Sequence, residues 1–217
     1  MGVADHVWDF AVLVLAYLVG AVPFSNLVAH RYAGLDLRHA GTGTTTPANL
    51  HRTAGLRPAV LAGVLEVAKG MVGPALIGPD RPLLAAVAGG LAVTGHNWSP
   101  LLRGRGGRGI STATGALLVV AWPGAVFMFG CLVMGILTRR VLVFMRAAAF
   151  ALLPLLGLID GRRGLLLGAI LVGPIGFKTT HEIFRRRLLD PLVRRGAKRS
   201  GDGTDIVIRG CGRDAPP

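Results

Sequence analysis

The sequence predicts an all-α, polytopic membrane protein with seven transmembrane helices, an external N-terminus and a cytoplasmic C-terminus. Of the 217 residues, 52% are hydrophobic and only 16% are charged, and the mean hydropathy is +0.56. A soluble protein built around one core does not carry so much apolar surface. Apolar stretches recur along the whole chain, and the Lys and Arg residues between them fall almost entirely on one predicted side.

Taken in order, the seven apolar stretches cover residues 7–29, 59–77, 83–102, 110–122, 125–137, 141–159 and 165–177. The first is predicted to be a transmembrane helix and not a signal peptide, because the N-terminus carries Asp5 and Asp9 and has no Lys or Arg before Arg31. The fourth and fifth have about 13 residues each, whereas a ~30 Å hydrocarbon core requires about 20. One kinked span over residues 110–137 is therefore an alternative.

The positions of the basic residues favour seven spans. With the N-terminus outside, 20 of the 24 Lys and Arg residues lie on the inner side, Lys69 lies within a span, and only Arg81, Arg162 and Arg163 lie outside. Six spans would place whole basic groups on the wrong side. We therefore expect residues 122–124, Trp-Pro-Gly, to form a tight external turn. The bacterial cytoplasmic membrane is the expected location.

The net charge of +13 would suggest nucleic acid as a partner in a soluble protein. Here the arginines lie between apolar spans, which favours anionic membrane lipids as partners and excludes nucleic acid. We predict a membrane domain over residues 1–187 and a basic, disordered cytoplasmic tail over residues 188–217. Cys131 and Cys211 lie in settings that predict neither a disulfide nor a metal site.

The run GHNWSPLLRGRGGRG, residues 95–109, predicts an anion site at a membrane surface. Its glycines allow backbone N–H groups to turn toward a ligand, and its arginines supply positive charge. Phosphate suits such a site. Two alternatives stay open for this run alone: a flexible loop whose arginines only fix topology, and a nucleic-acid-binding segment rich in Arg and Gly.

A second polar segment covers residues 34–57, which lie on the same predicted side. It offers the hydroxyls of Thr42, Thr44, Thr45 and Thr46, the amide of Asn49 and two guanidinium groups, Arg38 and Arg52. Such groups suit a phosphate. The alternative is a solvated loop in which a Thr or Asn caps the next helix.

Glu66 and Lys69 are three residues apart in the second apolar stretch, so on a helix they share a face and neutralise each other. Ionisable groups within a bilayer usually mark a functional site, although an ion pair that only joins helices is the alternative. His96 stands at the inner end of the third stretch, where it can relay protons or simply hydrogen-bond at the interface. The remaining histidines show no metal-ligand spacing, so no metal is predicted.

Five motifs, in order, resemble those of the acyl-phosphate-dependent glycerol-3-phosphate acyltransferases, the PlsY-type membrane family of bacteria. The family's GSxPF, DxR, GSGNxGATNxxR, DxxKG and GHxFPxFxxxKGGKG correspond here to GAVPF, DLR, GTGTTTPANLHR, EVAKG and GHNWSPLLRGRGGRG. The resemblance covers residues 17–187. It implies seven helices and a cytoplasmic site, in agreement with the charge count.

The resemblance also implies a reaction, in which a fatty acyl group passes from acyl phosphate to the sn-1 hydroxyl of glycerol 3-phosphate, giving lysophosphatidate without a cofactor. It assigns catalysis to Thr42, Lys69 and His96. It assigns the substrate phosphates to Arg38, Gly41, Gly43, Asn49, Arg52, Arg105, Gly106, Gly107, Arg108 and Gly109.

The chain is a divergent member by this resemblance, because Ala21, Thr44, Pro47 and Thr179 stand where the family has Ser, Asn, Ala and His. His181 lies two positions after the family's His, on a different helical face. Two alternative functions follow: a catalytically impaired paralogue that binds phosphate or lipid, and a small transporter.

Overall fold

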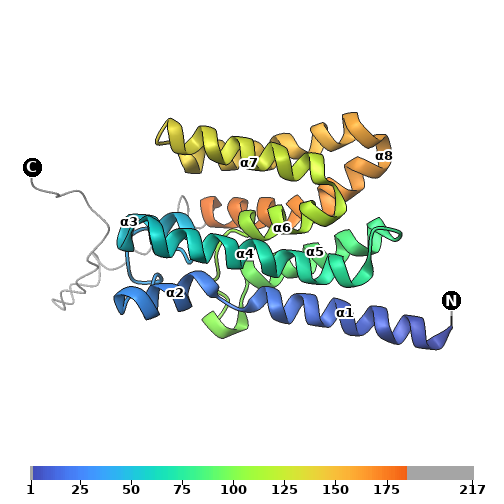
Figure 1. The fold of residues 1–217 in the computed structure, drawn as a ribbon, viewed down its shortest axis with the longest axis horizontal. Coiled ribbons are helices and arrows are strands. Elements are labelled where there is room, and N and C mark those ends of the chain that lie inside the picture. Colours follow the sequence, from blue (N-terminus) through green and yellow to red (C-terminus); the bar gives the residue numbers. More distant parts are fainter. Residues whose placement is uncertain (1, 185–217) are drawn as a thin grey trace, which may run out of the picture. The chain divides into compact units, whose positions relative to one another are not determined.

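The computed structural model describes residues 2–184, and every regular element in that range is helical (Figure 1). The elements are α1 (Val3–Ala21), α2 (Phe24–Ala33), α3 (Pro47–Ala54), α4 (Leu56–Ile77), α5 (Pro82–Asn97), the 3-10 turn η1 (Pro100–Leu102), α6 (Ile110–Val120), α7 (Trp122–Leu137) and α8 (Val141–Phe184). The predicted all-α class is confirmed for these residues. The predicted tail, residues 188–217, lies outside them.

The chain divides into two compact units, Met1–Gly176 and Phe177–Pro217. The first unit contains α1 to α7 and most of α8. Of the second unit, the structure describes only residues 177–184, which continue α8 to its end.

The outer surface of the first unit is apolar, as a membrane protein requires. Three helical segments are long and apolar enough to cross a bilayer: Val3–Ala33, Leu56–Ile77 and Val143–His181. α6 and α7 are apolar but shorter. Phe10, Phe129 and Leu158 are 70%, 63% and 87% exposed. Such surface is costly in water but suits lipid tails, and the prediction of a polytopic membrane protein is confirmed.

The first predicted span, residues 7–29, is not one continuous helix, because the chain breaks at Val22 and Pro23 between α1 and α2. Proline has no backbone N–H and its ring clashes with the preceding turn. The Val22 carbonyl oxygen accepts a hydrogen bond from Lys69 Nζ at 2.7 Å, and the Ala21 carbonyl oxygen accepts one from Ser99 Oγ at 2.5 Å. Side chains from elsewhere in the fold therefore supply hydrogen bonds to the carbonyl oxygens that the break leaves without a helical partner.

The predicted turn at residues 122–124 is wrong by a few residues. The break between α6 and α7 falls at Ala121, which has φ −155° and ψ 75°, and Trp122, Pro123 and Gly124 form the first turn of α7. Proline is favoured there because the first helical N–H groups have no intrahelical partner. The alternative of one continuous kinked helix over 110–137 does not hold, since Figure 1 shows that the chain reverses between α6 and α7.

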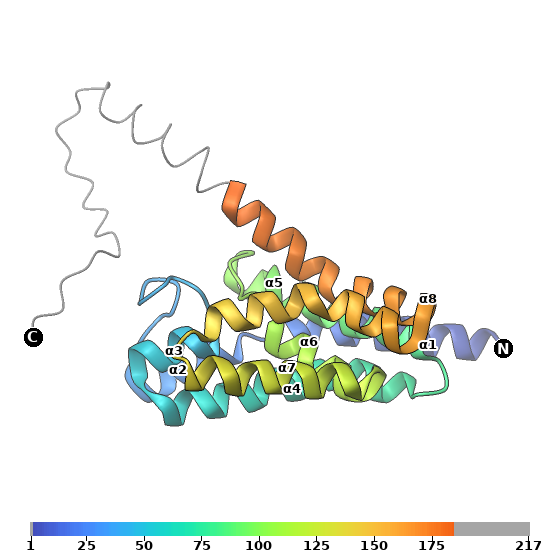
Figure 2. The ribbon, with the colours of Figure 1, turned by 90° about the horizontal axis from the view of Figure 1, so that it is seen from above.

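α8 folds back on itself near its middle. Asp160 and Gly161 leave the helical region, with Gly161 at φ +54°, and Figure 2 shows the reversal. A Cβ at Gly164 would collide with the Leu156 carbonyl oxygen, and one at Gly168 would contact Leu153. The two halves therefore run antiparallel, which agrees with the separate predicted stretches 141–159 and 165–177.

Small residues bring the helices that carry the site close together. A Cβ at Gly20 of α1 would collide with Ala92 of α5, and one at Gly70 of α4 would collide with the Thr112 backbone of α6. Helix pairs in membranes commonly use small residues in this way. As a result the end of α5, the start of α6 and the break after α1 lie next to one another.

Candidate active site

The loop between α2 and α3 is organised by the buried amide of Asn49, which is 2% exposed. Its Oδ1 accepts a hydrogen bond from the Thr42 backbone N–H at 2.8 Å. Its Nδ2 donates to the carbonyl oxygens of Ala40 and Thr44, both at 2.9 Å. A single side chain thus satisfies three backbone groups of the loop, and Asn49 acts on the site by holding that loop.

Glycine and threonine residues complete the loop. Gly41 and Gly43 have φ +58° and +69°, and a Cβ at Gly41 would collide with Oδ1 of Asn49. Thr46 caps α3 by accepting a hydrogen bond from the Asn49 backbone N–H at 3.3 Å. The capping role considered for this segment is therefore present, in the same loop that lines the pocket.

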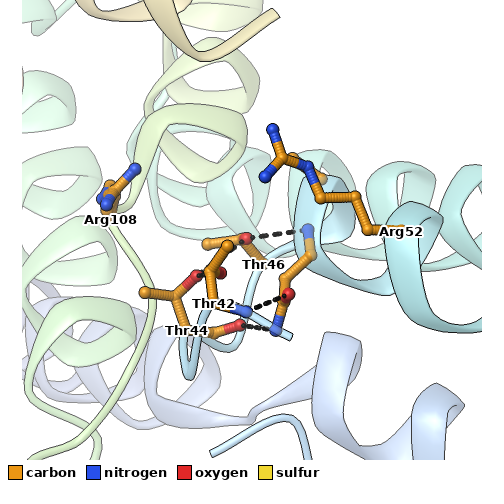
Figure 3. A pocket seen from close by; sticks show the side chains of 7 residues that line it. Thr42, Thr44, Thr46, Arg52 and Arg108 are labelled. Carbon is orange, nitrogen blue, oxygen red and sulfur yellow. Dashed lines mark hydrogen bonds between the residues drawn. The ribbon is translucent and has the colours of Figure 1, made fainter. Parts of the chain in front are cut away.

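A pocket opens between this loop, α3 and the Gly-rich loop, residues 103–109 between η1 and α6 (Figure 3). Two guanidinium groups face it from opposite sides, Arg52 from α3 and Arg108 from the Gly-rich loop. Between them lie the three hydroxyls of Thr42, Thr44 and Thr46. The pocket is shallow and open to solvent, and its cavity volume is only about 20 Å³. Two cations and several hydroxyl donors around one space suit a phosphate group.

The Gly-rich loop packs closely against the end of α5, which explains its glycines. A Cβ at Gly106 would collide with the His96 carbonyl oxygen, and one at Gly107 would collide with Nε2 of the His96 ring. Gly109 has φ +75°, and a Cβ at this position would collide with the side chains of Asn97 and Val93. The glycines therefore permit close backbone approach. Arg108, between two of them, is thereby held at the pocket.

Arg38 is engaged by a neighbouring carboxylate and is not among the residues that line the pocket. Its Nη2 and Nε donate to Asp36 at 2.6 Å and 3.0 Å. The hydrogen bond from Arg38 lowers the pKa of Asp36 to about 2, and the same bond raises the pKa of Arg38. Both side chains are partly exposed, so this pair stays accessible from the loop surface.

A second polar cluster is buried beside the break after α1. Lys69 Nζ lies 2.7 Å from Glu66 Oε2, and both side chains are at most 1% exposed. His96 Nδ1 lies 2.9 Å from the same carboxylate oxygen and 3.0 Å from Lys69 Nζ. The other oxygen, Glu66 Oε1, accepts hydrogen bonds from the backbone N–H and the hydroxyl of Ser25, at 3.1 Å and 2.9 Å. A charge buried in a bilayer must be paired and hydrogen-bonded, and the Glu66–Lys69 pair fulfils both conditions.

The predicted site residues are thus divided between two places. Thr42, Asn49, Arg52 and Arg108 line the pocket, whereas Lys69 and His96 belong to the buried cluster. The two places adjoin at Gly107, which contacts the His96 ring and precedes Arg108. Arg105 is exposed and does not line the pocket.

Sequence reasoning missed Ser25, which is fully buried against Glu66. Its signal was its place two residues after the helix-breaking Pro23. Thr179 and His181 lie in the part of α8 that belongs to the second unit, so their relation to the pocket stays a prediction.

Known proteins resemble this chain in sequence and in fold. The family model for glycerol-3-phosphate acyltransferase matches residues 10–189. The glycerol-3-phosphate acyltransferase of Synechococcus sp. (strain JA-3-3Ab) is 38% identical over 144 residues, which is 64% of this chain and 70% of that protein. Glycerol-3-phosphate acyltransferase 2 of Moorella thermoacetica is 40% identical over 119 residues, which is 53% of this chain and 59% of that protein.

Among solved structures, the fold is similar to the crystal structure of PlsY (YgiH), an integral membrane glycerol 3-phosphate acyltransferase, in its glycerol 3-phosphate form. The TM-score is 0.72 at 24% identity, and the match covers 82% of this chain and 90% of that one. A second crystal structure of PlsY (YgiH), in its lysophosphatidic acid form, gives a TM-score of 0.70 at 21% identity.

Proposed function

The chain belongs to the glycerol-3-phosphate acyltransferase family, and we propose that it transfers a fatty acyl group from acyl phosphate to the sn-1 hydroxyl of glycerol 3-phosphate. The products are lysophosphatidate, a phospholipid precursor, and inorganic phosphate. The relatives and structures named above are all acyltransferases, and none of them favours an impaired paralogue or a transporter. The pocket between Arg52 and Arg108 is the observation in this chain that carries the proposal.

In this proposal the pocket binds the phosphate of a substrate. A phosphate monoester carries a charge of about −1.5 to −2 at pH 7, and two arginines neutralise it with forked hydrogen bonds. The hydroxyl of Thr42 and the backbone N–H groups of the Gly-rich loop complete the set of donors. Arg38 joins this set when it exchanges Asp36 for a substrate phosphate.

Catalysis then rests on holding both substrates in place and on stabilising the oxyanion that forms at the acyl carbon. His96 packs against Gly106 and Gly107 of the Gly-rich loop, and Lys69 Nζ lies 3.0 Å from the His96 ring, so both lie close enough to the pocket to act on the bound substrates. The leaving phosphate is a chemically suitable acceptor for the proton of the attacking hydroxyl. No step of this proposal requires a cofactor.

We further propose seven crossings of the bacterial cytoplasmic membrane, with the N-terminus outside. The segments for these crossings are α1 with α2 across the break at Val22 and Pro23, then α4, α5, α6, α7 and the two halves of α8. The reversals after α6 and within α8 support this count. The inner side carries most of the basic residues, which also suits contact with anionic lipids.

The proposed function is tested by phosphate release from acyl phosphate by the purified protein, with and without glycerol 3-phosphate. We expect release to depend on glycerol 3-phosphate and to match the lysophosphatidate formed. Binding of glycerol 3-phosphate without any acyl transfer would contradict the enzyme and favour a binding protein.

A further inference from the structure

The three threonines that line the pocket contact one another in a row. Thr42 Oγ1 lies 2.8 Å from Thr44 Oγ1, which lies 3.4 Å from Thr46 Oγ1. They are alternate residues, so their side chains share one face of the loop, while Thr45 between them is buried with 2% exposure. Figure 3 shows the row between the two arginines.

The hydrogen-bond capacity of this row leaves one donor for a ligand. Each hydroxyl has one O–H to donate and two acceptor sites. Two contacts within the row use two of the three O–H groups, in whichever direction they run. Thr46 also accepts the capping bond from the Asn49 N–H, which uses none of these donors. One O–H therefore always remains to point out of the row into the pocket.

We propose that Thr42, Thr44 and Thr46 act as one hydrogen-bonded donor unit for the acceptor's phosphate, and that Thr44, which contacts both others, holds the unit together. This proposal rests on the proposed function. The family motif that the sequence resembles has Asn and Gly at the positions of Thr44 and Thr46, so the row does not come with the motif.

The chemistry of the row favours a phosphate monoester over an uncharged polyol. Phosphate oxygens only accept hydrogen bonds from these groups, so a bound phosphate accepts the one O–H that the row leaves over and fixes the direction of the two contacts within the row. Hydrogen bonds to a charged acceptor are about twice as strong as neutral ones. Glycerol itself offers no charge to the row or to Arg52 and Arg108, so it gains little from the same contacts.

The first test is the affinity of purified full-length protein for glycerol 3-phosphate and, separately, for inorganic phosphate, by calorimetric titration in detergent. Thr44→Val keeps the shape but removes both contacts of the row, so the Thr42 and Thr46 hydroxyls are no longer oriented by a neighbour, and we expect it to weaken both affinities roughly tenfold. Thr44→Ser keeps the hydroxyl and should bind within about twofold of the wild type. Wild-type affinity in Thr44→Val, or equal loss in both variants, would overturn the proposal.

Thr53→Val is the matched control. The Thr53 hydroxyl donates to the Asn49 carbonyl oxygen within α3 at 3.0 Å and does not line the pocket. It should leave both affinities unchanged. If Thr44→Val does not fold, as judged by thermal unfolding, Thr42→Val carries the same test, since it removes one end of the row.

A double-mutant cycle tests whether the row acts as one unit. Thr44→Val already separates Thr42 from Thr46, so the Thr42→Val/Thr44→Val double variant should lose less affinity than the product of the two single losses. Fully multiplicative losses would show independent donors and contradict the proposal. Because these readouts are binding affinities, they are distinct from acyl transfer: a wild type that binds but transfers nothing refutes the proposed function alone.

Discussion

Arg52 and Arg108 reach the pocket from different parts of the chain and are held in different ways. Arg52 projects from α3, whose start is fixed by the Thr46 cap, while Arg108 is fixed by the glycines on either side of it. Guanidinium groups remain charged at every physiological pH. A phosphate bound between them therefore gains both charges without a change of protonation in the protein.

Removal of the Arg108 charge should weaken glycerol 3-phosphate binding. Arg108→Ala loses charge-assisted hydrogen bonds worth about 1.5–3 kcal/mol, so the dissociation constant should rise roughly ten- to hundredfold. Titration of the purified protein measures this. Arg103→Ala is the control, because Arg103 lies in the same loop, is exposed and does not line the pocket. Similar losses in both variants would argue for a general charge effect instead of a site.

The Asp36–Arg38 pair should make a pH-dependent contribution to stability. The pKa of Asp36 is lowered from 3.8 to about 2 by its hydrogen bond from Arg38. A lowered carboxyl pKa stabilises the fold above the unfolded value, and this stabilisation is lost as pH falls from about 4 through about 2. The difference in thermal stability between wild type and Asp36→Asn should therefore shrink over that range. A constant difference down to pH 2 would exclude the pair as its cause.

For single residues, the sequence predicted which side chains line the pocket better than it predicted which groups they bond to. Thr42, Arg52 and Arg108 were predicted to meet at a phosphate site, and they line one pocket. The engagement of Arg38 by Asp36 was not predictable, because it depends on loop dihedrals that the residue spacing does not specify. The same applies to Asn49, whose amide turns inward to its own loop.

Among the secondary-structure elements, the break between α1 and α2 links the membrane helices to the site. The Lys69 and Glu66 side chains of α4 bond to Val22 on one side of the break and to Ser25 on the other. A proline kink in a membrane helix requires other groups to satisfy the freed backbone. The buried ion pair fulfils that requirement.

Breaking this ion pair should be more damaging than removing it. Lys69→Met leaves the Glu66 carboxylate buried without its cation, which should destabilise the protein by about 3–5 kcal/mol. The Glu66→Gln/Lys69→Met double variant should recover part of that loss. Unfolding midpoints in detergent provide the comparison. A double variant that is less stable than Lys69→Met would contradict the pairing.

Sequence periodicity located most helices, but not their ends. The apolar stretches over 59–77 and 141–159 agree with α4 and the first half of α8. The break at Pro23 was missed because hydrophobicity continues through it. The α6–α7 turn was misplaced because Pro is as well suited to the first turn of a helix as to a loop.

Residues 2–184 form a largely apolar helical assembly, in which Arg52 and Arg108 line one pocket and Glu66, Lys69 and His96 form an adjacent buried cluster. Basic residues on one side of the spans predict its orientation in the membrane. Single cysteines at Arg105 and Arg162, introduced after Cys131 and Cys211 are changed to Ser, test this in intact cells. The cysteine at 162 should react with an impermeant reagent and the one at 105 should not. The reverse pattern would invert the proposed topology.

The central claim is acyl transfer to an acceptor whose phosphate lies between Arg52 and Arg108. Conversion of isotope-labelled glycerol 3-phosphate to lysophosphatidate by the wild type, Arg52→Ala and Arg108→Ala in proteoliposomes with acyl phosphate tests it most directly. We predict labelled lysophosphatidate from the wild type, and a KM for glycerol 3-phosphate at least roughly tenfold higher in each variant. No labelled product from a folded wild type, or a wild-type KM in both variants, would contradict the account.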